Sequence, residues 1–465
     1  MASYEDLVNR MGADQPTFSR REMLKQGAAA VVGGGAGALI GQPPLLAQGP
    51  QNAAATAAAE AERQAPGKTT GLKTRALVRY ADKLETETLT LLPLHPQHVV
   101  IRNQAAQCCY STTNVLNTTT PAMNATVAGH GGVGIVEEVG SAVKRVRVGD
   151  QVIIAITTHC GACSNCLNGR GDLCYQLATR PRLPSATMSD GTPVDIAFLP
   201  SAYSEYVVTW EDFLVPVFTK VPPAEMAVLA CVGATGLGLA MNRYPIEAGT
   251  EVAVFGLGPI GVSAVQGARI QGAKTIIGID PIRYRRELAL KLGATHVLDP
   301  NALRGNDLIN RIRELTPDVA PAGRRYLGEH VAGPLYVIEA AGGTRFPVGV
   351  GVESPPDMTG VEPLQQAWTV ARSAGYVRTC SIGHPMGASV SFPAAQWSNA
   401  GKTHVPGNYA GVQALRDLPK FVRLIEQGLY DAKSMVGRVF TTNQMREAQQ
   451  AAADRTWITA VIDFT

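Results

Sequence analysis

A glycine-rich turn between two apolar runs constrains the fold of this chain more than any other feature. The run 252–255 has the β-branched and aromatic residues of a buried strand, and it leads directly into the pattern Gly-x-Gly-x-x-Gly. A helical stretch follows, and a second apolar run, 275–279, ends at Asp280. Strand, turn, helix and strand in this order predict a βαβ unit of a doubly wound parallel sheet, so we expect an α/β fold.

The glycines of this turn are those that a nucleotide-binding turn requires. Gly256 permits the tight turn, Gly258 lets a pyrophosphate approach the backbone, and Gly261 allows the helix to pack closely on its strand. Ile260 belongs to the same turn, and the free N–H groups that begin the helix favour a bound phosphate. Glycine turns also occur for structural reasons alone, but the flanking elements and the following acid favour a dinucleotide site.

The residues after the second apolar run bear on the choice of nucleotide. Asp280 lies close to the roughly 20-residue offset expected of an acid that binds the ribose 2′-hydroxyl. Its charge would repel a 2′-phosphate, which favours NAD over NADP. Arg283, Arg285 and Arg286 lie just beyond it and weaken that preference, and Arg285 is a further candidate for contact with the nucleotide.

Four of the eight cysteines are clustered within fifteen residues. They are Cys160, Cys163, Cys166 and Cys174. This spacing allows four thiolates to converge on one tetrahedral ion, and such a closed site is typical of structural zinc. An iron–sulfur cluster and two disulfides are the alternatives.

Three further residues form a candidate catalytic metal site. Cys109, His130 and Cys231 would supply two thiolates and an imidazole, which leaves a fourth position open for substrate. Each also has a structural interpretation, because Cys231 could be a small core residue and His130 a residue of a turn. Cys108 shows that a cysteine in this region need not be a ligand.

Length and composition exclude several classes of protein. A chain of 465 residues with 45% hydrophobic residues has enough material for two or three domains with substantial cores. The net charge of +3, with acids and bases interspersed, predicts no nucleic-acid partner. Because no run of 18 strongly apolar residues occurs, we expect no stable membrane insertion.

The N-terminus resembles a twin-arginine export signal. Arg20 and Arg21 precede a methionine and a leucine, and an alanine- and glycine-rich apolar stretch, 28–40, follows. We therefore predict export to the periplasm or beyond, with a disordered extension of a cytoplasmic protein as the alternative. An exported enzyme has no cytoplasmic NAD pool, so we also expect the nucleotide to be held tightly or regenerated by a second substrate.

Taken in chain order, these motifs resemble those of the zinc-dependent alcohol dehydrogenases of the medium-chain dehydrogenase/reductase family. The resemblance covers roughly residues 72–465 and includes Cys-x-Ser, Gly-His, the four-cysteine cluster, Cys-x-x-x-Thr-Gly and the glycine-rich turn with its acid. It implies a GroES-like, β-rich catalytic domain divided in the sequence by a Rossmann NAD-binding domain. The expected bounds are a signal peptide at 1–47, a linker at 48–70, catalytic segments at 71–232 and 399–465, and the Rossmann domain at 233–398.

The resemblance also implies roles for individual residues. Cys109, His130 and Cys231 match catalytic zinc ligands and the four clustered cysteines match structural ligands, which gives two zinc ions per chain. Ser111 matches the hydroxyl that takes the proton of the substrate alcohol. Zinc would polarise the substrate oxygen, and hydride would pass between an alcohol, aldehyde or ketone and NAD.

Other implications concern the nicotinamide and the assembly. Thr235 matches a residue beside the nicotinamide, and Ile382 and His384 match residues that line its pocket. The family forms dimers or tetramers, so we expect a homo-oligomer that acts on a small molecule.

The sequence departs from the family pattern beside the catalytic metal. Gly131 stands where an acid usually follows the histidine, Thr112 replaces the aspartate that orients this histidine, and Asn114 replaces a relay histidine. Loss of such partners commonly lowers metal affinity or activity about 10–100-fold. Two alternatives to the dehydrogenase therefore remain: an exported oxidoreductase whose tightly bound NAD passes hydride between two substrates, and a zinc- and NAD-binding protein with altered catalysis.

The second half of the chain shows local patterns without readable chemistry. Residues 343–363 form a segment longer than a strand-to-helix loop needs, which could cover the nucleotide, make an interface or lie in solvent. Helices are predicted at 418–428 and 445–454, and the alternating run 458–464 predicts an edge strand.

Overall fold

The computed structural model describes residues 63–119, 122–196, 200–317, 325–326, 329–344, 346–380 and 387–465. The export signal predicted at 1–47, most of the linker that follows it, and Ile382 and His384 lie outside these residues. Residues 63–70 are described and contact the fold: the guanidinium of Arg63 donates to the carbonyl of Pro93, and Thr69 donates to a carboxylate oxygen of Glu138. The end of the predicted linker therefore belongs to the folded part.

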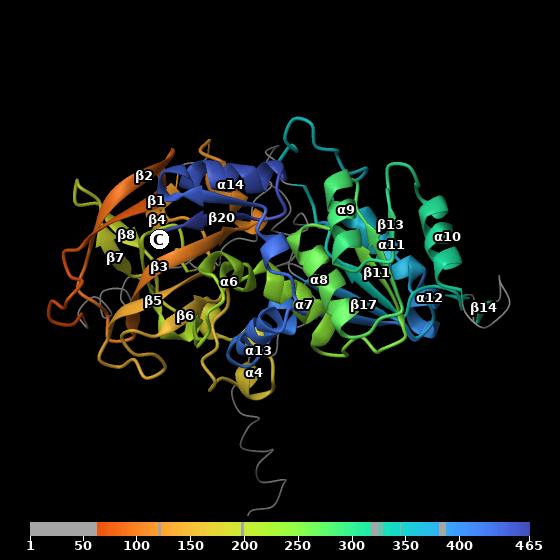
Figure 1. Ribbon diagram of the computed structural model, residues 1–465, viewed down its shortest axis with the longest axis horizontal. Helices are drawn as coiled ribbons and strands as arrows, with labels where there is room; N and C mark the ends of the chain where they lie inside the picture. The colour runs from red at the N-terminus through yellow and green to blue at the C-terminus, as the bar shows by residue number, and fades with distance from the viewer. Residues whose placement is uncertain are drawn as a thin grey trace, which may run out of the picture. The chain divides into compact units, whose positions relative to one another are not determined.

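The first part of the chain is rich in β-strands, which form a small barrel and a seven-stranded sheet (Figure 1). The barrel has the order β1-β2-β7-β8-β4, with β1 (Lys73–Ala81), β2 (Lys83–Leu91), β4 (Ala122–Val127), β7 (Pro184–Thr187) and β8 (Pro193–Asp195). The sheet contains β3 (His98–Cys108), β5 (Gly132–Val139), β6 (Gln151–Ile154), β9 (Tyr206–Trp210), β10 (Leu214–Pro216), β19 (Arg438–Thr441) and β20 (Ala460–Asp463). Short helices α4 (Ser164–Leu167) and α5 (Gln176–Thr179) lie in the cysteine-rich segment between β6 and β7.

The C-terminal strand returns to this first part of the chain. β20 pairs antiparallel with β3 and parallel with β19, so Ala460 lies opposite Cys108. The alternating pattern of residues 458–464 correctly predicts a strand, but the prediction of an edge strand is wrong. β19 takes the edge position, and β20 has hydrogen-bonded neighbours on both sides.

The glycine-rich segment forms the centre of a parallel sheet with the order β13-β12-β11-β16-β17-β18. Its strands are β11 (Glu251–Phe255), β12 (Thr275–Ile279), β13 (His296–Leu298), β16 (Tyr336–Glu339), β17 (Tyr376–Cys380) and β18 (Thr403–Gly407). Every neighbouring pair is parallel, which is the 3-2-1-4-5-6 order of a Rossmann domain. β18 extends the sheet beyond residue 398, where the sequence had suggested that the domain ends.

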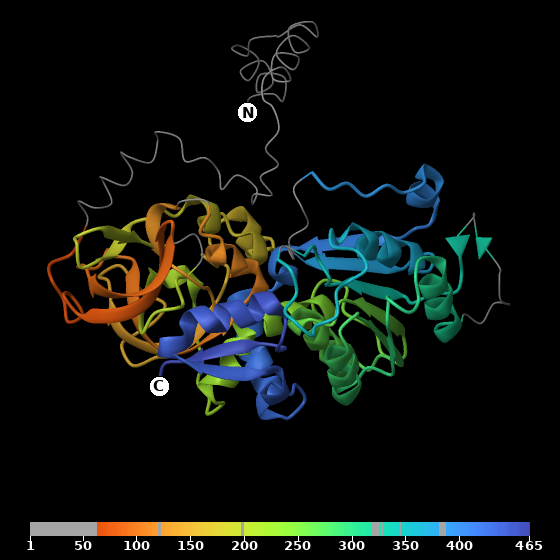
Figure 2. The ribbon, with the colours of Figure 1, turned by 90° about the horizontal axis from the view of Figure 1, so that it is seen from above.

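Helices cover both faces of this sheet (Figure 2). They are α7 (Val232–Met241), α8 (Pro259–Ile270), α9 (Arg283–Leu292), α10 (Asn306–Leu315), α11 (Val361–Val370) and α12 (Ala394–Asn399). The preceding helix α6 (Pro223–Leu229) packs instead on β3 and β5 of the seven-stranded sheet, and α13 (Ala414–Glu426) and α14 (Met445–Asp454) lie nearer the C-terminus of the chain. Alternate residues of β11 enter different cores, since Val252 and Val254 pack with α7 and α8, whereas Ala253 and Phe255 pack with α10 and α11. This alternation explains the continuous apolar runs of the sequence, because strands of a parallel sheet are buried on both faces.

A two-stranded hairpin of β14 (Arg325–Tyr326) and β15 (Glu329–His330) follows α10. Among the described residues no single helix has the length and hydropathy of a membrane span, although α6 and α7, bent by 51° to each other, pass that test as a pair.

Candidate active site

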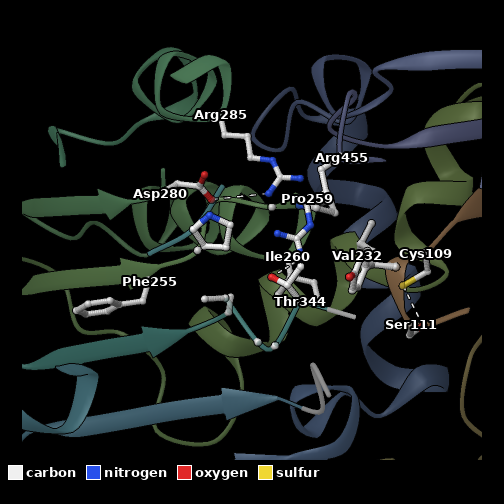
Figure 3. Close-up of a pocket in the computed structure, with 18 of the residues that line it drawn as sticks. Cys109, Ser111, Val232, Phe255, Pro259, Ile260, Asp280, Arg285, Thr344 and Arg455 are labelled. Carbon is white, nitrogen blue, oxygen red and sulfur yellow. Dashed lines mark hydrogen bonds and ion pairs between the residues drawn. The ribbon is translucent and has the colours of Figure 1, made fainter. Parts of the chain in front are cut away.

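A cavity of about 450 Å³ lies between the β-rich part and the parallel sheet and is lined by residues of both. Cys109, Ser111, His130 and Cys231 line it on one side, and residues of the glycine-rich turn line it on the other. Figure 3 shows Cys109 and Ser111 from the β-rich part opposite Asp280, which follows β12, and Arg285 of α9. A volume of this size is typical of a ligand-binding pocket.

The structure brings the three candidate catalytic ligands together. One ligand atom from each of Cys109, His130 and Cys231 lies within 4.8 Å of the others, and all three residues are buried. Cys109 follows β3, His130 lies between Ala128 and β5, and Cys231 lies at the junction of α6 and α7. These residues come from three separate segments, so only the packing of those segments on one another forms the group.

Two buried thiols side by side create an electrostatic problem that a cation would solve. The sulfur atoms of Cys109 and Cys231 are 3.8 Å apart. The hydrogen bond from Cys231, supported by His130 and Ser111, lowers the pKa of Cys109 well below its usual value. The hydrogen bond to Cys109 and burial raise the pKa of Cys231. Both sulfurs can be thiolates together only if a positive charge compensates them, and a divalent metal fits this donor set.

Ser111 lies at the cavity wall next to these ligands. Its Oγ is 2.8 Å from Nε2 of His130 and 3.1 Å from Sγ of Cys109. The hydroxyl of its neighbour Thr112 points elsewhere, because it lies 2.9 Å from the Cys109 carbonyl and 3.1 Å from Oε1 of Gln449. Thr112 therefore does not take over the orienting role of the aspartate that it replaces.

Two buried glutamines beside this group were missed in the sequence analysis. Nε2 of Gln107 lies 3.4 Å from Nδ1 of His130, and Gln449 contacts both Thr112 and the carbonyl of Cys109. Both glutamine side chains are fully buried. Gln449 is more than 300 residues from Cys109 in the chain, so no local motif identifies it, and Gln107 precedes Cys109 but lies outside the Cys-x-Ser pattern.

The four clustered cysteines form a second group away from the cavity. One sulfur from each of Cys160, Cys163, Cys166 and Cys174 lies within 4.8 Å of the others. All eight cysteines of the chain are free, so the alternative of two disulfides is not adopted. Burial acts to raise the pKa of Cys163, but backbone N–H groups of Cys166 and Tyr175 lower it to about 6. A thiolate favoured in this way, with three further sulfurs, fits a closed tetrahedral zinc site.

The glycine-rich turn has the geometry that its sequence predicts. Gly256 has a φ of +84°, a conformation that side chains other than glycine rarely adopt. A Cβ on Gly261 would lie 1.8 Å from the carbonyl oxygen of Gly256, so the close approach of helix and strand requires glycine. Gly258 is the residue before α8, and a Cβ there would meet only Arg285, at 3.7 Å.

Asp280 and Arg285 lie at the nucleotide end of the cavity. The carboxylate of Asp280 accepts hydrogen bonds from the backbone N–H groups of Leu257 and Ile282, each at 2.7 Å. Nη1 of Arg285 is 3.8 Å from the same carboxylate. Burial acts against the charged form of Arg285, but Tyr284 and Asp280 raise its pKa, so the guanidinium remains a cation. Figure 3 shows both side chains directed into the cavity.

The long segment after β16 also lines the cavity, through Gly343, Thr344, Pro355, Pro356 and Asp357. Oγ1 of Thr344 accepts a hydrogen bond from Arg455, whose guanidinium lies 4.9 Å from the centre of the Tyr110 ring. The backbone of Gly349 donates to the carbonyl of Asp454. On the sheet side, the backbone N–H of Arg283 lies 3.3 Å from Glu353. The described residues of this segment, 343–344 and 346–357, therefore bridge the two sides of the cavity, and we call them the bridging segment.

Comparison with known proteins places the chain in a family. Residues 95–219 match the family model described as "Alcohol dehydrogenase GroES-like domain", and residues 259–426 match "Zinc-binding dehydrogenase". Together the two models cover more than half of the chain. The chain belongs to the zinc-dependent alcohol dehydrogenases of the medium-chain dehydrogenase/reductase family.

Sequence matches to individual curated proteins support the same family. The chain is 35% identical over 241 residues to S-(hydroxymethyl)glutathione dehydrogenase of Escherichia coli, a match that covers 50% of this chain and 65% of that protein. It is 32% identical over 232 residues to NDMA-dependent alcohol dehydrogenase of Amycolatopsis methanolica, covering 48% of this chain and 62% of that protein. The chain thus spans somewhat less than two thirds of the length of these curated relatives.

A solved structure shares the fold. Benzyl alcohol dehydrogenase from Acinetobacter calcoaceticus superposes with a TM-score of 0.69 and 23% identity, covering 84% of this chain and 99% of that one. In the present chain, nearly all residues that the sequence suggested for the site line the cavity, including Thr235 and Ile260. Gly261 and the four clustered cysteines do not line it, and Ile382 lies outside the described residues.

Proposed function

We propose that this protein transfers a hydride between an alcohol, or the corresponding aldehyde or ketone, and NAD. The observation that supports the proposal is a single cavity that joins Cys109, His130 and Cys231 to the glycine-rich turn and Asp280. A metal site and a nucleotide site that share one cavity can bring a polarised carbon–oxygen bond next to a nicotinamide.

The residues of the cavity would have different roles in this hydride transfer. Cys109, His130 and Cys231 would hold a zinc ion, which supplies a Lewis acid to the substrate oxygen. Ser111 can accept the alcohol proton through Oγ, because this atom lies at the cavity wall beside His130. Thr235 lines the cavity between the two ends, and its hydroxyl donates to the carbonyl of Cys231, which fixes this part of α7.

The nucleotide end of the cavity favours NAD. Its pyrophosphate would lie against Gly258 and the first turn of α8, where backbone N–H groups are free. The carboxylate of Asp280, held by two backbone N–H groups, presents a negative charge where a 2′-phosphate would need a positive one. Arg285 lies beside it and would contact the adenosine ribose or the phosphates.

A count of zinc ions tests the metal site. Elemental analysis of the purified protein should give two ions per chain, and Cys109→Ala should reduce the count to one and abolish alcohol oxidation. Cys108→Ala is the matched control, because this cysteine is adjacent and buried but belongs to neither group of sulfurs. One ion in both the wild type and Cys109→Ala would remove the Lewis acid from the proposal and favour a zinc- and NAD-binding protein with altered catalysis.

A second candidate function is an oxidoreductase whose NAD stays bound and passes hydride between two substrates. The bridging segment supports it, because hydrogen bonds hold this segment across the cavity: Arg455 donates to Thr344, the backbone of Gly349 donates to the Asp454 carbonyl, and the backbone of Arg283 donates to Glu353. A nucleotide beneath such a bridge would leave slowly. Nucleotide should then be present in acid extracts of the purified protein, and Arg455→Ala should lose it faster than the control Arg446→Ala. Nucleotide-free protein after a simple purification would contradict this candidate.

Export and assembly are proposals that follow from the sequence. Twin-arginine export carries folded proteins, so metal and nucleotide could be inserted before transport, and replacing Arg20 and Arg21 with lysine should retain the protein in the cytoplasm. Finding the protein in the cytoplasmic fraction before this change would contradict export. We also propose a homo-oligomer, which light scattering on the purified protein would show as a mass of two or four chains.

A further inference from the structure

Gln107 occupies the place from which a zinc-binding histidine is normally oriented. It lies in β3 with its side chain fully buried, and its amide is 3.4 Å from Nδ1 of His130 and 3.3 Å from the carbonyl of His130. The opposite ring nitrogen, Nε2, faces Ser111 at 2.8 Å on the side of the two thiols. The imidazole thus has one nitrogen for the metal and one for Gln107.

The space around Gln107 explains one departure from the family pattern. A Cβ built on Gly131 would lie 3.3 Å from Nε2 of Gln107 and 3.1 Å from Cβ of Ala230. A side chain after the histidine would press on the glutamine amide and on Ala230, so the glycine at this position favours the observed place of Gln107.

Hydrogen-bond chemistry then determines which atom of the amide faces the ring. A histidine that gives the lone pair of Nε2 to a metal carries its proton on Nδ1, and that proton needs an acceptor. Oε1 of Gln107 is buried without a hydrogen-bond partner, while Nε2 faces His130. Rotation of the amide by 180° exchanges these two atoms within the same volume. It replaces contact between two donors with a hydrogen bond from Nδ1–H to Oε1, and the contact with the His130 carbonyl is given up.

We propose that Gln107 is the positioning residue of His130: when zinc is bound, its side-chain oxygen accepts the Nδ1 proton and holds the imidazole toward the metal. The proposal rests on the zinc site proposed above. It assigns to a neutral amide the role that a carboxylate has in the family, while Thr112 is engaged with Cys109 and Gln449. A neutral partner donates less electron density to the imidazole, so the ion keeps more of its positive charge.

Two substitutions of Gln107 by side chains of similar size distinguish the effect of losing the hydrogen-bond acceptor from the effect of changing the side-chain volume. Gln107→Met keeps the chain length but removes the acceptor, and we expect it to weaken zinc binding at the three-residue site about 10–100-fold. Gln107→Glu keeps an acceptor oxygen and should bind zinc at least as tightly as the wild type. Gln266→Met is the control, because Gln266 is equally buried and accepts a hydrogen bond from the Asp431 N–H, but belongs to neither group of ligands and does not line the cavity.

The measurement is a chelator competition that resolves both ions of each chain. The ion of the four-cysteine group serves as an internal reference for folding, because its affinity should be the same in all four proteins. Equal affinity of wild type and Gln107→Met at the three-residue site would overturn the proposal, and so would a Gln107→Glu variant as weak as Gln107→Met. A wild type without a second ion would instead overturn the proposed zinc site, so the two failures are distinguishable.

Discussion

Oγ of Ser111 and Nε2 of His130 lie 2.8 Å apart at the wall of the cavity, although nineteen residues separate them in the chain. Ser111 belongs to the 3-10 helix Tyr110–Leu116 that follows β3, and His130 precedes β5, which is hydrogen-bonded to β3. Because β3 and β5 are neighbours, the packing of one sheet places a hydroxyl beside the candidate metal ligand. A substrate oxygen at the metal would lie within reach of the same hydroxyl.

Removal of this hydroxyl should slow the reaction without emptying the metal site. Ser111→Ala is expected to lower kcat for alcohol oxidation about 10²–10⁴-fold, because proton transfer from the substrate loses its first acceptor. Ser111→Thr keeps the hydroxyl and should retain most of the activity. Steady-state kinetics and zinc analysis on the same samples check this, and normal kcat in Ser111→Ala would exclude a role for Ser111 in proton transfer.

Asp280 should control the choice between NAD and NADP. Asp280→Asn removes the negative charge but keeps an oxygen that can accept from Leu257 or Ile282, so we expect the fold to persist. The ratio of kcat/KM for NAD to that for NADP should fall at least about tenfold, since Arg285 can then attract a 2′-phosphate. Glu287→Gln changes the net charge equally on the exposed side of α9 and should leave the ratio unchanged. An unaltered ratio in Asp280→Asn would show that selectivity lies elsewhere.

Two glycines of the same turn should respond differently to alanine. Gly261→Ala places Cβ 1.8 Å from the Gly256 carbonyl, so backbone must move, and we expect about 3 kcal/mol of destabilisation and a lower Tm. Gly258→Ala meets only a flexible arginine at 3.7 Å and should change the free energy of unfolding by less than about 0.5 kcal/mol. Its methyl group would nevertheless weaken NAD binding, because the pyrophosphate approaches the backbone there. Thermal unfolding and NAD titration of both variants test this prediction. Equal losses of stability in Gly261→Ala and Gly258→Ala would contradict it.

His98 should make the fold less stable in mild acid. This residue is buried against Trp210, with ring centroids 4.3 Å apart, and burial, followed by the nearby His95, Arg63 and Arg180, lowers its pKa well below 6.5. The unfolded chain therefore binds a proton at His98 that the folded chain does not, so stability is fully present above about pH 6.5 and falls below it.

The loss can reach about 1.4 kcal/mol per pH unit for one such group. His98→Phe keeps an aromatic ring but cannot titrate, so its unfolding free energy should fall less than that of the wild type between pH 7 and pH 5. Parallel slopes for the two proteins in denaturant titrations at these pH values would show that His98 does not cause acid sensitivity.

Local patterns predicted the parts of the fold that depend on neighbouring residues. The glycine-rich turn, its two strands and the intervening helix occur where the sequence indicated, because their periodicity and turn residues act within about thirty positions. β2 has no clear signal in the sequence, because Glu85 and Glu87 interrupt its apolar pattern. β20 was wrongly predicted at an edge, because alternation does not reveal how many neighbours a strand has.

The sequence by itself determined the motifs whose members are close together in the chain, namely the four-cysteine cluster and the nucleotide turn. Only the tertiary structure decided that Cys109, His130 and Cys231 converge, that Gln107 rather than Thr112 faces His130, and that the bridging segment reaches Arg455. The physical reason is that a short stretch of chain between two residues limits how far apart they can lie, so their spacing in the sequence predicts that they are close in space. Contacts between distant segments depend instead on how whole strands and helices pack, which no local pattern encodes.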